Sequence, residues 1–282
     1  MPPRPERSGA GASTVNGLHG MYLHHRLNSS RLVVLLQQWA RDDGARATQL
    51  PQPDVALTLS QWLSTVDAVQ LSRALHTIES LPVAERARAE PGIAIDLAAL
   101  DRFVQKAQAD LSTLLTARAA APKPLRARAD NTPVALPNPE ADADFGAHGP
   151  RYLELQRQMD TRLLALRAQV RHAIAKGRPA LRQLAALDAV MEQMLGAREQ
   201  RLWASLPSHL ERRLAYRYQS HQLALQAPGL ADEPHRWRQP GGWLWAFEQD
   251  MQALLLAEMQ VRLLPITGLL EAAHNEKTGQ QE

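Results

Sequence analysis

The chain has 282 residues, which is enough to build one large or two small domains, each with its own core. Hydrophobic residues make up 45% but aromatic residues only 5%, and the many alanines, leucines, glutamines, arginines and glutamates favour helices over sheets. The absence of cysteine excludes disulfides, thiolate zinc sites and a cysteine nucleophile, and a net charge of +3 is too small to require a nucleic-acid or membrane partner.

Residues 1–28 are rich in proline, glycine, serine and histidine and predict a disordered tail. The histidines His19, His24 and His25 lack a carboxylate or thiol at ligand spacing, so we expect a solvated segment and no metal site. No basic and apolar leader follows Met1, and no run approaches the roughly 18 apolar residues of a membrane span. We therefore expect a cytoplasmic protein without a transmembrane segment.

Residues 29–117 predict an N-terminal module of helices. The first helix ends near Gly44, and the second begins at Thr58, which fits a capping box with Gln61. The third begins after Asp96, a favourable N-cap. Each helix carries apolar residues at helical spacing, so the three helices are expected to pack together as a small bundle.

Residues 118–150 change character, because prolines recur among alanine, aspartate and arginine without any apolar period. A basic part precedes an acidic part. Such a composition is typical of an extended, mobile linker, and we place a disordered linker and the domain boundary here.

Residues 151–273 predict an antiparallel C-terminal bundle with coiled-coil-like packing, built on a long helical hairpin that runs from about residue 151 to 226. The glycine of Lys176-Gly177-Arg178-Pro179 is expected to close the first arm in the left-handed conformation, and the proline to open the second arm. The first arm keeps one apolar stripe on one helical face: Tyr152, Leu155, Met159, Leu163, Leu166, Val170 and Ile174. A last helix begins near Trp243 and is expected to kink at Pro265, before a disordered tail at residues 274–282. The predicted fold is therefore all-α, with two helical modules joined by a Pro-rich linker.

Cations and aromatic rings lie close together in the loop 227–245, between prolines and glycines. The candidate partner-binding residues there are Arg236, Trp237, Arg238, Trp243 and Trp245. Tryptophan and arginine dominate interface energetics and can stack on bases. The alternative is that the tryptophans plug the end of the bundle and the arginines cover it.

A second basic and aromatic group, Arg212, Arg213, Tyr216 and Arg217, occupies one stretch of helix. It could hold phosphates, or its arginines could form salt bridges with neighbouring acidic helices. Glu258 lies on or beside the apolar stripe of the last helix, where a carboxylate could serve catalysis, bind a metal or pair with an arginine of a neighbouring helix. No phosphate-binding loop, nucleophile elbow or His-Glu-x-x-His pair occurs, so we assign no catalytic, cofactor or metal residues.

Several segments resemble an uncharacterised all-helical family of proteobacterial proteins, a domain of unknown function. They are Gln61-Trp62-Leu63 with Asp67-Ala68 and Leu71-Ser72, Tyr152-x-x-x-Gln156-x-x-Met159, Leu184-Ala185-Ala186-Leu187-Asp188, Glu211-Arg212-Arg213, and the run from Met251 through Leu255-Leu256-Ala257-Glu258 to Pro265. Genes of that family often lie beside genes for MotA-like channel proteins and OmpA-like envelope proteins. The resemblance implies an accessory role in an envelope-associated assembly and assigns no catalytic residue.

Taken together, these features favour a non-enzymatic cytoplasmic interaction or scaffold protein with protein partners. The alternative is a nucleic-acid-binding protein that uses the basic and aromatic helix and loop. Exposed apolar stripes would also allow a homodimer, since the sequence alone does not separate intramolecular from intermolecular helix pairing.

Overall fold

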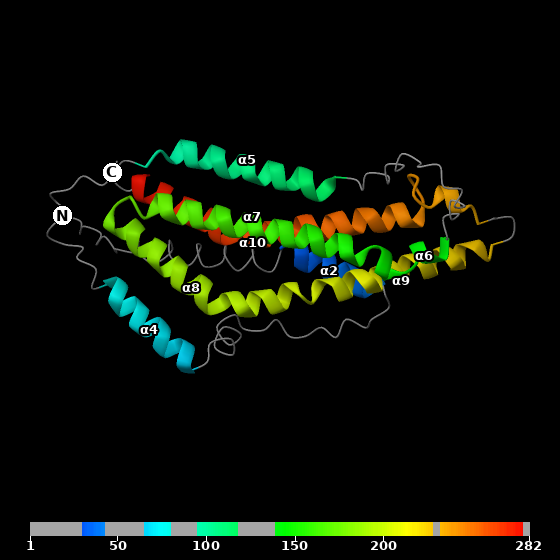
Figure 1. Cartoon of the computed structure of the whole chain (residues 1–282), viewed down its shortest axis with the longest axis horizontal. Coiled ribbons are helices and arrows are strands. Elements are labelled where there is room, and N and C mark those ends of the chain that lie inside the picture. The colour runs from blue at the N-terminus through cyan, green and yellow to red at the C-terminus, as the bar shows by residue number, and fades with distance from the viewer. Residues whose placement is uncertain (1–29, 43–64, 80–94, 118–138, 228–231, 279–282) are drawn as a thin grey trace, which may run out of the picture.

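A computed structural model describes residues 30–42, 65–79, 95–117, 139–227 and 232–278, and in these ranges all regular structure is helical (Figure 1). The all-α class is thereby confirmed. The longer helices are α2 (Arg31–Asp42), α4 (Thr65–Glu79), α5 (Leu97–Thr116), α7 (Gly149–Ile174), α8 (Pro179–Trp203), α9 (Leu206–Leu225) and α10 (Trp243–Thr278). Short turns of helix occur at α6 (Pro139–Asp142), η1 (Phe145–Ala147) and η2 (Pro234–Arg236).

Helix α10 is the central element, because it packs against α7, α9, α5, α2 and α8. Its buried residues therefore lie on several faces rather than along one stripe; Leu244, Phe247, Leu254, Leu255, Ala257 and Ile266 have no exposed surface. The helix runs through Pro265 without ending, and it continues beyond residue 274, where we expected a disordered tail. A helix surrounded by others can carry apolar residues on most of its circumference.

By length and composition alone, α10 is also apolar enough to cross a membrane between Trp243 and Glu276. The expectation from sequence did not include such a segment. Half of this window is buried inside the protein, and the core helix of a soluble protein has the same composition. This helix is thus weak evidence for a membrane span.

The expected helical hairpin forms as α7 and α8, but its second arm ends at Trp203 rather than near residue 226, because α9 begins at Leu206. The α7 stripe is buried at Tyr152, Met159, Leu163, Leu166, Val170 and Ile174, and Leu155 is partly buried against it. Pro179 lies in the first turn of α8, as expected. Gly177 departs from expectation, because Gly241 is the glycine with positive φ among the described residues. A Cβ on Gly177 would lie 2.7 Å from Ile95 Cδ1 and 3.1 Å from the carbonyl oxygen of Ile174, so glycine fits a closely packed position here without a left-handed backbone.

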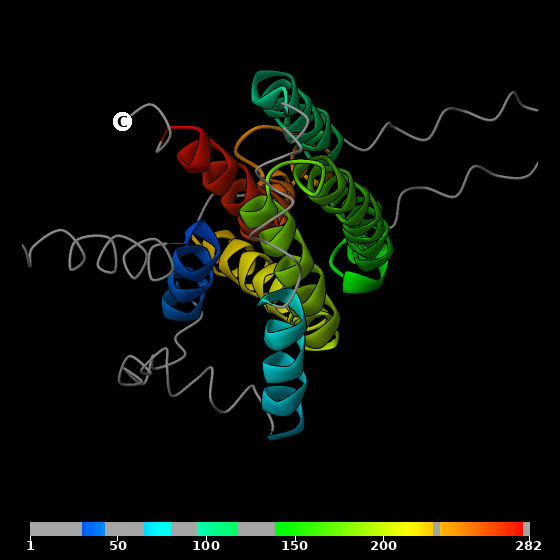
Figure 2. The same cartoon turned by 90° about the vertical axis from the view of Figure 1, so that its left-hand side faces the viewer.

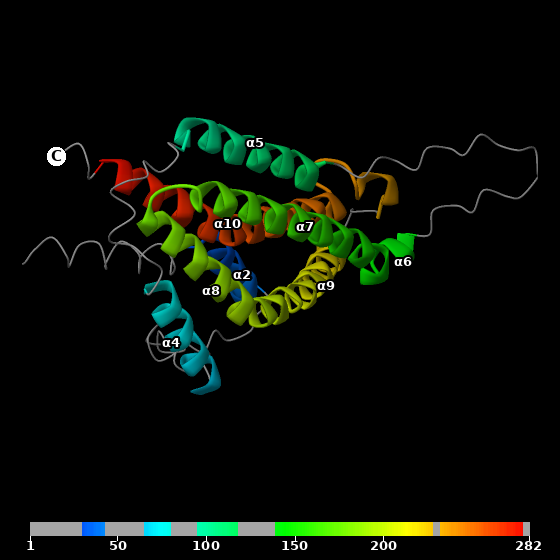
Figure 3. The same cartoon turned by 60° about the vertical axis from the view of Figure 1, so that its left-hand side comes forward.

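The N-terminal helices do not form the small bundle that we expected. In the described residues α2 and α5 pack on α10, α5 also packs on α7, and α4 packs on α8 (Figures 1 and 3). The N-cap of α5 is confirmed, since the backbone N–H of Ala99 donates to Asp96 Oδ1 at 2.9 Å. An amphipathic face predicts that a helix is buried on one side but not which helix covers it. Here α2 and α5 pack on the wide apolar surface of α10.

Part of the expected linker is helical. Residues 139–150 form α6, η1 and the start of α7, and the Nε2–H of buried His148 donates a hydrogen bond to the carbonyl oxygen of Asp142 at 2.9 Å. Residues 118–138, the tail at 1–28 and the capping box at Thr58 lie outside the described residues. Helix α9 begins at Leu206, with Pro207 in its first turn.

Candidate functional site

Aromatic rings gather where the C-terminal end of α9 meets the start of α10. The rings of Trp237 and Trp243 lie 5.4 Å apart between centroids and meet edge to face at 60°. His221 of α9 stacks on Trp243 at 6.0 Å, and Tyr218 meets the same indole edge to face at 5.4 Å. Only 6% of Trp237 and 7% of Trp243 are exposed. Both tryptophans are therefore mostly buried, and both line the cleft described below.

A carboxylate fixes these rings in place. Asp232 Oδ1 accepts a hydrogen bond from Trp237 Nε1 at 2.8 Å and lies 3.1 Å from His221 Nε2. Sequence reasoning did not single out Asp232 or His221 for this loop, because no motif links a histidine on α9 to an aspartate eleven positions later. The Nε1 atom of Trp243 is buried without a hydrogen-bond partner among the described residues.

The aromatic cluster forms the floor of a cleft of about 560 Å³, which we call the α9–α10 cleft. It is lined by His221, Ala224, Leu225, Asp232, Glu233, Arg236, Trp237, Gln239, Pro240, Gly241, Gly242 and Trp243. The turn that forms one wall depends on glycine twice. Gly241 has a φ of 92°, which other residues rarely adopt, and a Cβ on Gly242 would lie 2.2 Å from the carbonyl oxygen of Trp237.

The remaining candidate residues of this loop have separate positions. The Arg236 side chain is 69% exposed at the edge of the cleft, and its Nε lies 2.6 Å from Glu233 Oε2. Arg238 bridges two elements through Asp142 at 2.8 Å and Glu248 at 3.1 Å. Trp245 is half-buried, and its backbone N–H donates to the Trp237 carbonyl at 2.9 Å. Of these, Arg236, Trp237 and Trp243 come together at the cleft.

The basic and aromatic stretch of α9 places Arg213 inside the fold. The Arg213 side chain is 5% exposed, and its guanidinium contacts Asp42 of α2 at 2.9 Å and Asp250 of α10 at 2.8 Å. It lies 5.3 Å from the ring centroid of Trp39 and 4.9 Å from that of Tyr216. Buried charges need such partners, and Arg213 joins three helices.

Its neighbours on α9 differ in their environment. Arg217 lies 2.7 Å from Asp250 Oδ2, so two arginines share one carboxylate. Arg212 is exposed and contacts His209 Nδ1 at 2.9 Å, within its own helix. The salt-bridge alternative thus describes Arg213 and Arg217, and Arg212 remains on the surface.

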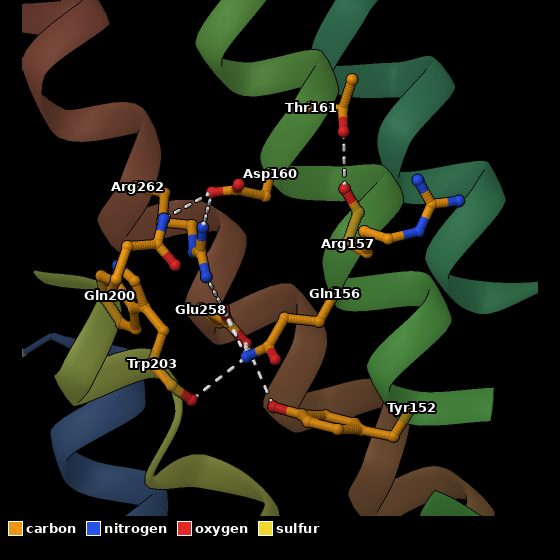
Figure 4. Close-up of polar contacts among 9 residues, drawn as sticks. All are labelled: Tyr152, Gln156, Arg157, Asp160, Thr161, Gln200, Trp203, Glu258 and Arg262. Carbon is orange, nitrogen blue, oxygen red and sulfur yellow. Dashed lines mark hydrogen bonds and ion pairs between the residues drawn. The ribbon is translucent and has the colours of Figure 1, made fainter. Parts of the chain in front are cut away.

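Glu258 is fully buried at the centre of a polar network between α7, α8 and α10 (Figure 4). Its carboxylate accepts hydrogen bonds from the Tyr152 hydroxyl at 3.1 Å, from Gln156 Nε2 at 3.0 Å and from Arg262 at 2.5 Å. Gln156 also donates to the carbonyl oxygen of Trp203 at 3.2 Å. The expected arginine partner exists, but it lies one turn along the same helix rather than on a neighbouring one.

Arg262 extends this network outward. It donates to Asp160 Oδ1 at 2.5 Å, and its guanidinium lies 4.7 Å from the ring centroid of Trp203. Burial raises the pKa of the Glu258 carboxyl, against the opposing charge of Arg262 and the hydrogen bonds from Gln156 and Tyr152. Burial also raises the pKa of Tyr152, followed by the charge and hydrogen bond of Glu258, so the phenol stays protonated and donates.

These polar networks bind helices to one another. Among the described residues no group of three or more histidines, aspartates and glutamates is placed to hold a metal ion. Glu258 has no exposed surface, so a substrate would not reach it without separation of α7 from α10. The α9–α10 cleft is the place where candidate residues meet open space.

Removal of Arg213 should destabilise the fold far more than removal of Arg212. Arg213→Ala leaves Asp250 and Asp42 with fewer cationic partners and should lower the free energy of unfolding by about 3 kcal/mol. Arg212→Ala removes an exposed side chain and should change it by less than about 0.5 kcal/mol. Urea denaturation of both variants measures the difference; equal effects would contradict the role of Arg213 as a link between helices.

The raised pKa of Glu258 predicts the sign of a pH effect. The folded state holds the proton more tightly than the unfolded state, so the free energy of unfolding should fall as the pH rises from about 4.5 through the raised pKa. Glu258→Gln lacks this contribution. Its stability relative to the wild type, measured by urea denaturation across that pH range, should therefore improve as the pH rises. A relative stability that worsens with pH would mean that the donors lower the pKa instead.

Comparison with known proteins identifies a family. A family model described as a protein of unknown function (DUF3348) matches residues 21–275. No curated protein and no solved structure matches the chain. The match spans most of the sequence and includes the α9–α10 cleft, the inward-facing arginines and the Glu258 network. The chain belongs to the DUF3348 family.

Proposed function

We propose that the protein is a non-enzymatic interaction protein of the cytoplasm, which binds a protein partner at the α9–α10 cleft. The observation that carries this proposal is the cleft itself, about 560 Å³ in volume, with Trp237 and Trp243 in its floor and Arg236 at its edge. Aromatic residues and arginine in a concave site are typical of the anchoring positions of protein interfaces. A rigid floor also limits the entropy lost on binding.

The distribution of polar groups supports a binding role over catalysis. Arg213, Arg217 and Arg262 are paired with carboxylates, and Glu258 is satisfied by its donors. An accessory role in an envelope-associated assembly rests on the resemblance to proteobacterial proteins whose genes lie beside those for MotA-like and OmpA-like proteins. This role suggests envelope-associated proteins as the partners to test.

Nucleic-acid binding is the alternative. It would use Arg212 and Arg236, since the guanidinium groups of Arg213 and Arg217 contact Asp250. Such binding would weaken steeply with salt in proportion to the number of phosphate contacts.

Filling the cleft should abolish partner binding without loss of the fold. Ala224 is exposed and lines the cleft, so Ala224→Arg places a long side chain in it and leaves the tryptophans intact. The matched control is Ala215→Arg, because Ala215 is exposed on the same helix, and a separation of nine residues is about two and a half turns, which places it on the opposite face.

The measurement is capture of tagged full-length variants from native cells, with and without nuclease, followed by quantitative mass spectrometry. We expect Ala215→Arg to recover a defined set of envelope proteins with and without nuclease. Ala224→Arg should recover these proteins in amounts at least about tenfold lower, which corresponds to about 1.4 kcal/mol of binding free energy. Equal recovery by both variants would remove the cleft from the proposal. Recovery that collapses with nuclease would favour the nucleic-acid alternative.

A further inference from the structure

A second concave surface lies between α5 and α7, far from the aromatic cluster. Two hollows of about 330 and 220 Å³ border Phe103 on α5, and together they form what we call the α5–α7 groove. Small and aliphatic residues line it from both helices: Ala99, Leu100, Ala107, Ala165, Leu166 and Ala173. Small side chains on both walls leave room for a bulky side chain from outside.

The two helices that line the groove lie apart from the other N-terminal helices. Figure 2 shows α5 and α7 along one side of the protein, opposite α2 and away from α4. Phe103 is 43% exposed between the two hollows. Exposure of a phenylalanine in an alanine-lined groove is typical of a surface that another helix covers.

Charges of opposite sign border the two sides of the groove. Asp96, which caps the start of α5, and Lys176, two residues beyond the end of α7, line the first hollow, and Asp110 of α5 and Arg162 of α7 line the second. The charged residues that line the groove are therefore acidic on the α5 side and basic on the α7 side at both ends. Among the described residues, none of these four side chains forms an ion pair that would neutralise it.

We propose that this groove binds the same groove of a second copy of the chain. A twofold axis that runs parallel to the groove places α5 of one protomer over α7 of the other at the same level along the helices. Asp96 then faces the partner's Lys176, and Asp110 faces the partner's Arg162. Each Phe103 lies over the alanine-lined wall that the partner's α7 provides.

The charges select this arrangement. A twofold axis perpendicular to the groove would instead place α5 over α5, with aspartates facing aspartates at both ends, and like charges in an interface are unfavourable. The parallel axis matches every charge, and the same patch serves both protomers, as in other isologous dimers. This inference does not depend on the proposed function of the α9–α10 cleft, but a dimer would present that cleft twice.

The first test is the oligomeric state of full-length wild-type protein and of Phe103→Asp by sedimentation velocity at micromolar concentrations. We expect a wild-type dimer and a monomeric variant with unchanged helical circular dichroism, since Phe103 is not a core residue. The control is Leu153→Asp, because Leu153 of α7 is 51% exposed and lies outside the groove. That variant should remain dimeric.

The second test separates contacts between protomers from contacts within one. Asp110→Arg alone places arginine against the partner's Arg162, and Arg162→Asp alone places aspartate against the partner's Asp110, so each variant should be largely monomeric. A mixture of the two should form heterodimers, because both junctions then pair arginine with aspartate. Co-purification of the differently tagged variants measures this rescue, which an effect within one protomer would not produce.

A wild-type monomer at all concentrations would overturn the proposal. So would a dimer that both Phe103→Asp and the charge variants leave intact, because it would use another surface. A monomeric wild type in which Phe103→Asp abolishes binding of a different protein would assign the groove to that partner and would equally overturn the second-copy proposal.

Discussion

A carboxylate buried in the middle of the longest helix constrains the whole fold. Glu258 has no exposed surface, and transfer of such a group out of water is costly unless donors surround it. Tyr152 and Gln156 from α7 and Arg262 from α10 supply those donors. Because Gln156 also holds the carbonyl oxygen at the end of α8, one site fixes α7, α8 and α10 relative to one another.

Arginine–carboxylate pairs join other helices in the same way. Arg213 joins α9 to α2 and α10, and Arg167 and Arg171 join α7 to α8 through Asp188. These pairs add little to the free energy of unfolding beyond what apolar residues of equal volume would supply, but removal of one partner lowers it strongly because the other charge stays buried. Such networks therefore specify which helix faces meet. Among the described residues, the α9–α10 cleft and the α5–α7 groove are two concave surfaces that these networks leave open to other molecules.

Local features of the fold followed from the sequence, and long-range ones did not. The stripe of α7 was predictable because its apolar residues recur at helical spacing, and the start of α5 was predictable because Asp96 can cap it. The packing of α2 and α5 on α10 was not, since an amphipathic face does not specify its partner. The left-handed conformation expected for Gly177 is absent, and the sequence did not indicate that Ile95, far away in the chain, packs against this position.

The candidate site was predictable as a composition and not as a geometry. The sequence marked Trp237 and Trp243 but gave no sign of Asp232 and His221, which hold them, or of the inward orientation of Arg213. Glu258 was recognised as unusual, yet its donors on α7 lie more than one hundred residues away. Three residues from the segments that resemble the uncharacterised family meet at this one site: Tyr152, Gln156 and Glu258.

Native-state hydrogen exchange of the full-length chain tests most directly whether α10 and its buried network organise the fold. Residues 251–263 of α10 and the facing turns of α7 should exchange last and together, through global unfolding. Helix α4, in which no residue from 67 to 79 is fully buried, should exchange much earlier. Exchange of α10 as fast as that of α4, or a hairpin of α7 and α8 that stays protected after α10 has exchanged, would contradict this account.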